Sequence, residues 1–118
     1  MKLRIHGNSL RLRLTQKEVA RVRSGAQVES FLELPPGRAL VYLVESSPGP
    51  DAMSVTFDGR AIRVTIPMDQ AIEWVESDRT GIEARTPAGV QILVEKDFQC
   101  LHRSAEQEPD AYPHPLMR

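Results

Sequence analysis

Residues 95–104, EKDFQCLHRS, contain the single cysteine of the chain, Cys100, and one of its three histidines, His102. In an extended chain, residues two apart share a face, so the thiol and the imidazole can meet. A catalytic cysteine needs a thiolate of lowered pKa and a site for a carbonyl group. A zinc site needs three or four ligands, so His114 or Glu106 would have to join Cys100 and His102. Because cysteine is also among the most frequently buried residues, we favour a structural Cys100 over a nucleophile or metal ligand.

Basic side chains alternate with leucine and isoleucine at the start of the chain. Arg11 and Arg13 alternate with Leu10, Leu12 and Leu14, and guanidinium groups are suited to binding carboxylates and phosphates. Arg11 and Arg13 are therefore candidate ligands for an anion, together with Lys96 and Asp97 near the end of the last predicted strand. The alternative, which we favour, is that these arginines are solvated or are paired with acidic residues such as Glu33 or Glu83.

The chain lacks the linear motifs that mark the common enzyme and cofactor-binding classes. It has no G-x-x-x-x-G-K, G-x-G-x-x-G, C-x-x-C, H-E-x-x-H or G-x-S-x-G,. The acidic residues Glu106, Glu108 and Asp110 do not have the spacing of a calcium-binding loop, and a solvated run is the simpler interpretation. We expect a protein without a cofactor that is not an enzyme.

Charge is distributed unevenly along the sequence. Residues 1–47 contain eight basic and four acidic residues, and residues 53–97 contain five basic and eight acidic ones. The basic half is able to attract an anion or nucleic acid. Because no run of aromatic residues accompanies it, nucleic acid is an unfavourable hypothesis, and we expect the two halves to complement each other.

Hydrophobicity and cysteine content favour a cytoplasmic protein. The longest apolar run, ALVYLV at 39–44, is far shorter than the roughly 20 residues that cross a bilayer,. The first 14 residues alternate charged and apolar positions and do not resemble a signal peptide. A single cysteine excludes an internal disulfide.

The sequence pattern predicts eight strands and two short helices. Strands are expected at 3–5 and 10–14 around a Gly7–Asn8 turn, because apolar residues alternate there,. A helix is expected at about 16–24, because Thr15 and Glu18 form a capping-box pattern and Gly25 ends it. The remaining elements are strands at 27–34, 38–46, 53–57 and 60–66, a helix within 67–77, and strands at 80–86 and 90–98.

The second half repeats the order of the first at an offset of 52 residues. Both hairpin glycines, Gly7 and Gly37, have a glycine 52 positions later, and both helix starts coincide at this offset. We interpret this as a duplicated ββαββ unit, with repeats at 1–47 and 53–97. Two units related by a pseudo-two-fold axis would close one core and give an α+β domain over 1–97, with a mainly antiparallel sheet or barrel and two short helices. Residues 98–118 would form a C-terminal arm or tail.

The terminal motifs resemble those of a family of small bacterial proteins of uncharacterised function. Its members begin with G-N-S-[IL]-R-x-R-[LV] and end with E-K-D-F-x-C-L, an acidic stretch and an aromatic residue flanked by prolines. The positions that match this pattern are Gly7, Asn8, Ser9, Arg11, Arg13, Glu95, Lys96, Asp97, Phe98 and Cys100. His102 and His114 lie where the family is not expected to require histidine. The resemblance implies no activity.

These observations favour a non-enzymatic binding or interaction domain in the cytoplasm. Its partner would be a second copy of the chain or another protein, bound through a strand edge or the C-terminal arm, and not a membrane. The alternative is a site for a small anion or a metal, with or without enzymatic activity, centred on Cys100 and the hairpin arginines.

Overall fold

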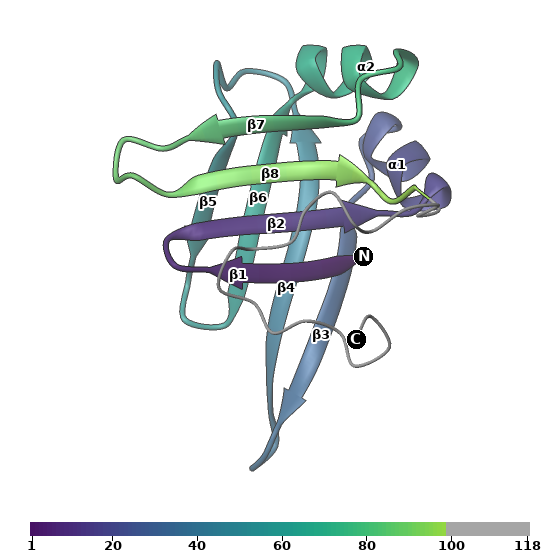
Figure 1. The fold of residues 1–118 in the computed structure, drawn as a ribbon. Coiled ribbons are helices and arrows are strands. Elements are labelled where there is room, and N and C mark those ends of the chain that lie inside the picture. The colour runs from purple at the N-terminus through teal and green to yellow at the C-terminus, as the bar shows by residue number, and fades with distance from the viewer. Residues whose placement is uncertain (99–118) are drawn as a thin grey trace, which may run out of the picture.

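The computed structural model describes residues 1–98 of the chain. Two helices and eight strands follow one another in the predicted order (Figure 1). They are β1 (Lys2–His6), β2 (Ser9–Leu14), α1 (Gln16–Arg23), β3 (Val28–Leu34), β4 (Arg38–Ser47), β5 (Ser54–Phe57), β6 (Ala61–Pro67), α2 (Met68–Glu76), β7 (Gly81–Arg85) and β8 (Gln91–Lys96). Neither helix is long or apolar enough to cross a membrane.

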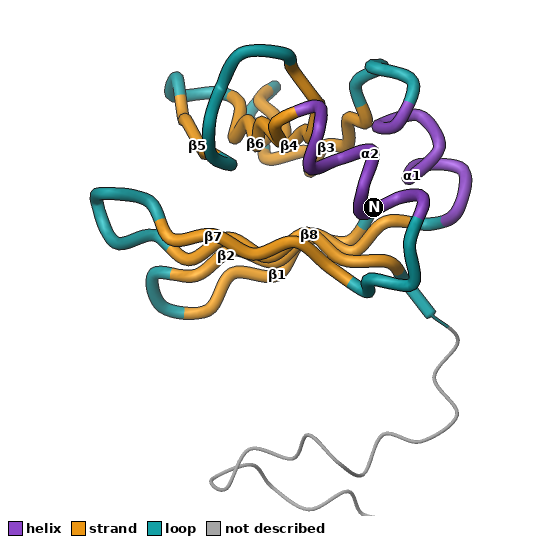
Figure 2. Tube along the Cα trace, turned by 90° about the horizontal axis from the view of Figure 1, so that it is seen from above, coloured by secondary structure: helices purple, strands orange, loops and turns teal. Residues whose placement is uncertain are grey.

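The strands form two four-stranded sheets that pack face to face. Sheet A has the order β1-β2-β8-β7 and sheet B the order β3-β4-β6-β5. Every hairpin is antiparallel, while the two central pairs, β2 with β8 and β4 with β6, are parallel. The predicted α+β class and mainly antiparallel pairing are therefore confirmed. The barrel alternative is wrong, because the two sheets stay separate layers (Figure 2).

Each ββαββ unit contributes one hairpin to each sheet. The first unit provides β1–β2 to sheet A and β3–β4 to sheet B, and the second provides β7–β8 to sheet A and β5–β6 to sheet B. Exchanging the two units therefore exchanges the two sheets, as the predicted pseudo-two-fold requires. The parallel central pairs join strands of different units, so neither unit completes a sheet on its own.

The hairpin registers repeat at the predicted offset of 52. Leu3 faces Leu12 in the first hairpin, and Val55 faces Val64 in its counterpart. The register across the central pairs differs by two residues from this offset, because Val64 faces Val44 whereas Leu12 faces Val94. A shift of two keeps every inward side chain inward, since successive side chains alternate between the faces of a strand.

Local signals explain where the elements begin and turn. The Thr15 side chain accepts a hydrogen bond from the Glu18 N–H, and the Glu18 carboxylate accepts one from the Thr15 N–H, so the predicted capping box is confirmed,. Gly7 has a φ of 55° at the first central position of the β1–β2 turn, a conformation that strains other residues,.

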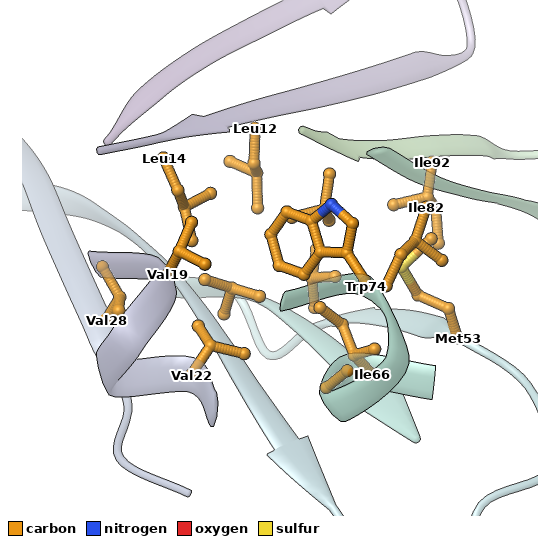
Figure 3. Packing of buried hydrophobic residues seen from close by; sticks show 14 of the residues in the cluster. Leu12, Leu14, Val19, Val22, Val28, Met53, Ile66, Trp74, Ile82 and Ile92 are labelled. Atoms are coloured by element: carbon orange, nitrogen blue, oxygen red, sulfur yellow. The ribbon is translucent and has the colours of Figure 1, made fainter. Parts of the chain in front are cut away.

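The core lies between the sheets and is closed at one end by the two helices (Figure 2). Equivalent positions of the two units are buried together, and Figure 3 shows the indole of Trp74 among residues of both sheets. Val22 of α1 corresponds to Trp74 of α2, and Val19 corresponds to Ala71. The large Trp74 is thus combined with three smaller residues in one buried cluster, which lets two short helices share one end of the sandwich,.

We expect the two units to be unable to fold separately, because each provides only one hairpin to each sheet. Fragments 1–49 and 50–118, cut within the loop after β4, should each lack a cooperative thermal transition. Mixed in equal amounts, they should recover the near-ultraviolet circular dichroism of Trp74. A cooperative transition in either fragment alone would contradict the interlocked topology.

Truncation of the buried helix residues should lower the free energy of unfolding, and the loss should be greater for the larger side chain. Trp74→Ala should lower the free energy of unfolding by about 3–5 kcal/mol, and Val22→Ala by about 2 kcal/mol, because both leave cavities in a close-packed core. Lys17→Ala, at an exposed position of α1, should change it by less than about 0.5 kcal/mol,. Urea denaturation followed by far-ultraviolet circular dichroism measures all three, and an equal effect of Lys17→Ala would be inconsistent with this core.

Candidate functional site

Within the strands, charge also separates by sheet. The strands of sheet A contain six basic and two acidic residues, whereas those of sheet B contain two basic and three acidic ones. The separation arises because each unit places one hairpin in each sheet. The predicted complementarity between the two halves takes the form of ion pairs between them, such as Arg11 with Glu95 and Arg23 with Glu76.

The outer face of sheet A, turned away from sheet B, carries most of the basic residues. We call it the basic face. Strand alternation and pairing place on it Lys2 and Arg4 of β1, Arg11 and Arg13 of β2, Glu83 and Arg85 of β7, and Glu95 of β8. The equivalent positions of Lys2, Arg4 and Arg13 on the outer face of sheet B are Ser54, Thr56 and Thr65. The basic character is therefore specific to sheet A and is not a by-product of the duplication.

Glu95 lies between the two predicted anion-binding arginines. Its Oε1 atom is 3.0 Å from Arg13 Nε and 3.3 Å from Arg11 Nε. The parallel register sets Glu95 directly beside Arg13, which explains the choice of partner. Glu33, named as a partner from the sequence, lies on β3 in the other sheet. An anion that binds Arg11 and Arg13 must compete with the Glu95 carboxylate.

A hollow of about 550 Å³ opens on the basic face toward the β1–β2 turn. Its polar lining includes Arg4, Ser9, Arg11, Glu83 and Arg85. Guanidinium and hydroxyl donors of this kind suit a carboxylate or a phosphate, and the Glu83 carboxylate opposes such a ligand. The hollow is open and half polar, so it can hold a small anion without burying it.

Lys96 and Asp97, the other two predicted ligand residues, lie on opposite sides of sheet A. Lys96 Nζ donates a hydrogen bond to the Ser77 carbonyl, 2.8 Å away, in the loop after α2. The Asp97 carboxylate is 3.3 Å from Lys2 Nζ on β1, and its backbone N–H donates to the Leu14 carbonyl. The structure thus brings Asp97 toward the basic face with Arg11 and Arg13, and it holds Lys96 away from them.

The predicted metal or nucleophile residues Cys100, His102 and His114 lie outside the described residues. Within residues 1–98, no three histidine, cysteine, aspartate or glutamate side chains gather in an arrangement that could hold a metal ion.

A second surface, which the sequence did not predict, lies at the end of the sandwich opposite the helices. There the inner faces of both sheets border an open apolar hollow of about 390 Å³, which we call the apolar mouth. Ile5 and Phe57 on its rim remain 59% and 61% exposed, and they occupy equivalent positions in the two units. Its apolar lining comprises Ile5, Leu10, Leu40, Val55, Phe57, Ile62 and Val90. The sequence contains a signal for this surface. The alternation of apolar residues continues to the ends of the strands, whereas each unit has one helix, and the two helices cover only one end of the sandwich.

The β3–β4 hairpin extends this apolar surface. The turn glycine of this hairpin, Gly37, comes seven residues before Val44, which pairs with β6. In the equivalent β7–β8 hairpin, Gly89 comes only five residues before Val94, which pairs with β2. Two further residues lengthen the hairpin by about 7 Å relative to its counterpart. Figure 1 shows its tip at the lower end of β3. Leu32 and Leu34 on the inner side of the projecting strand are 54% and 45% exposed. At the offset of 52 their counterparts are the smaller residues Ala84 and Thr86.

On the opposite layer, Glu45 and Arg63 form an ion pair across the central strands of sheet B. Glu45 Oε1 is 2.8 Å from Arg63 Nη1, and its other oxygen accepts a hydrogen bond from Gln27 at 2.7 Å. Burial raises the pKa of Glu45, but the hydrogen bonds from Gln27 and Arg63 outweigh it, so the pKa lies below its ordinary value. Arg63 is equivalent to Arg11, and Glu45 of β4 takes the place that Glu95 of β8 has in sheet A. An arginine–glutamate ion pair therefore joins the central strands of both sheets.

The fold and these surfaces define a two-layer α+β sandwich, built from a duplicated ββαββ unit, with one basic outer face and one open apolar end. The model of a family of unknown function, DUF7009, matches residues 1–116, and the chain belongs to that family. This agrees with the predicted resemblance to an uncharacterised family. Comparison with curated proteins and with solved structures finds no match.

The Glu45 carboxylate should make stability depend on pH. Because its pKa is lowered by folding, its contribution is present above the ordinary value of 4.5 and is lost as the pH falls through the lower folded value,. Glu45→Gln should lower the free energy of unfolding at pH 7 by less than about 1 kcal/mol, because the pair is partly solvated. The variant should also lose less stability than the parent between pH 5 and pH 3.

Urea denaturation at a series of pH values measures this difference. Glu76→Gln is the control, because Glu76 forms its ion pair with Arg23 on the exposed helix surface. A pH profile for Glu45→Gln identical to that of the parent would contradict the assignment.

Proposed function

We propose that this protein is a non-enzymatic interaction domain that acts in the cytoplasm as a homodimer. The observation that carries the proposal is the exposure of Ile5 and Phe57 on the two sides of the apolar mouth. Exposed apolar residues that gather in one patch are typical of interaction sites, whereas single ones are ordinary.

A second copy of the chain suits this patch because of its symmetry. Ile5 and Phe57 occupy equivalent positions in the two units. A true two-fold axis through the apolar mouth would therefore place Ile5 of one copy beside Phe57 of the other, and Phe57 beside Ile5. The projecting hairpin would supply Leu32 and Leu34 to the same contact. Four half-exposed large side chains provide roughly 400 Å², about half of what each partner buries in a standard interface, and the walls of the mouth would supply the remainder.

The oligomeric state tests the proposal. The full chain should run as a dimer in sedimentation velocity, and Phe57→Asp and Leu32→Asp should shift it to the monomer. Phe31→Asp is the matched control, because Phe31 is 60% exposed but lies on the outer face of sheet B. A monomer at high concentration would overturn the proposal, as would dissociation by Phe31→Asp alone.

The hollow on the basic face supports a second candidate function, the binding of a small anion by Arg11 and Arg85. Titration with inorganic phosphate, followed through amide chemical shifts, should perturb β1, β2 and β7. Arg11→Gln with Arg85→Gln should abolish the perturbation, while Arg79→Gln, outside the hollow, should leave it intact. Perturbations that are absent or spread evenly over both sheets would exclude this site.

The alternative function of a metal site, as distinct from an anion site, depends on Cys100, His102 and His114. Elemental analysis of the purified protein for a stoichiometric metal tests it directly. A metal that is retained after Cys100→Ser would exclude the cysteine as a ligand.

A further inference from the structure

We propose that the C-terminal segment of this same chain, residues 99–118, binds across the basic face of sheet A through Glu106, Glu108 and Asp110. The inference concerns contacts within one chain and is independent of the proposed homodimer. Three observations on residues 1–98 and on the sequence support it: where the chain leaves the sheet, the charge of the face, and the reach of the segment.

The chain leaves sheet A beside the basic face. The Asp97 N–H donates to the carbonyl of Leu14 on β2, and the Asp97 carboxylate lies 3.3 Å from Lys2 Nζ on β1. Because β2 lies between β8 and β1, this carboxylate reaches over the central strand toward the sheet edge. In Figure 2 the end of the described chain points away from sheet B. The last described acidic residue therefore already makes the type of contact that the following ones would extend.

The negative charge of the segment favours the basic face of sheet A over the outer face of sheet B. The strands of sheet A carry a net charge of +4 and those of sheet B a net charge of −1, from the counts given above. The stretch 105–110 contains three carboxylates and no basic residue. Arg11 and Arg13 share the single carboxylate of Glu95, so their guanidinium groups retain donors for further acceptors,.

The segment is long enough to reach every arginine of the face. Glu106 lies eight positions after Phe98, and this stretch spans up to about 28 Å when extended,. The six residues of β2 extend over about 20 Å,. Solvated ion pairs are weak individually, but the tether holds the segment at an effective concentration in the millimolar range, which favours the formation of several pairs at once.

Paramagnetic relaxation tests this placement. In a Cys100→Ser, Ala111→Cys variant of the full chain, a nitroxide on residue 111 should reduce the amide signals of β1 and β2 much more strongly than those of β3 and β5, which lie in the second sheet about 10 Å farther away,. The reduction should disappear with Glu106→Gln, Glu108→Gln and Asp110→Asn combined, and in 1 M salt, where charges are screened within about 3 Å.

A matched triple variant is Asp51→Asn, Glu73→Gln and Asp78→Asn, which removes the same charge from exposed positions elsewhere and should leave the effect unchanged. In a mixture of chain that carries the nitroxide with nitrogen-15-labelled chain that does not, the amide signals should not be reduced if the contact lies within one chain. Reduction in the mixture would assign the contact to a second copy and overturn the inference. Absence of selective reduction, or its persistence after neutralisation of the three carboxylates, would overturn it as well.

Discussion

The parallel pairing of the two central strand pairs holds this fold together. Pairing within each unit is confined to hairpins, and the units join through β2 with β8, through β4 with β6, and through the contact between the helices. Each central pair buries valine or leucine on its inner side and carries an arginine–glutamate pair on its outer side. Since exposed ion pairs contribute little, the buried side chains provide most of the stabilisation, and the ion pairs favour one register over the others.

This arrangement also determines which surfaces are left for function. Two helices enter the sandwich from one end and bury Val22 and Trp74 there, while the other end keeps Ile5 and Phe57 exposed. Because each sheet receives one hairpin from each unit, the charges of a unit are divided between the two outer faces. The apolar mouth and the basic face are thus consequences of the same topology, one at the open end of the sandwich and one on an outer face.

The local part of the structure could be predicted from the sequence, and the long-range part could not. Alternation, the Thr15–Glu18 capping box and the hairpin glycines predicted every element, because these signals act within a few residues. The central pairs join residues as far apart as Leu12 and Val94, and nothing local specifies such pairing,. The repeated Leu-Val-Glu at 43–45 and 93–95, at an offset of 50, was the available signal for the central register. Alternation also implies that Lys96 and Asp97 face opposite sides, so their assignment to one site was incompatible with the predicted strand.

The two units agree where the side chains face the core and differ where they face solvent, and this difference bears on function. Leu12 and Val64, or Leu14 and Ile66, serve the same buried role in the two sheets. On the outer faces, Arg4 corresponds to Thr56 and Glu33 to Arg85. A duplication supplies two identical outer faces at the start, and packing constrains only the inner positions. The outer positions were free to diverge, so the basic face of sheet A and the projecting tip of β3–β4 are features that the core does not require. Their properties are therefore not explained by the stability of the fold, and this is the ground for proposing them as binding surfaces.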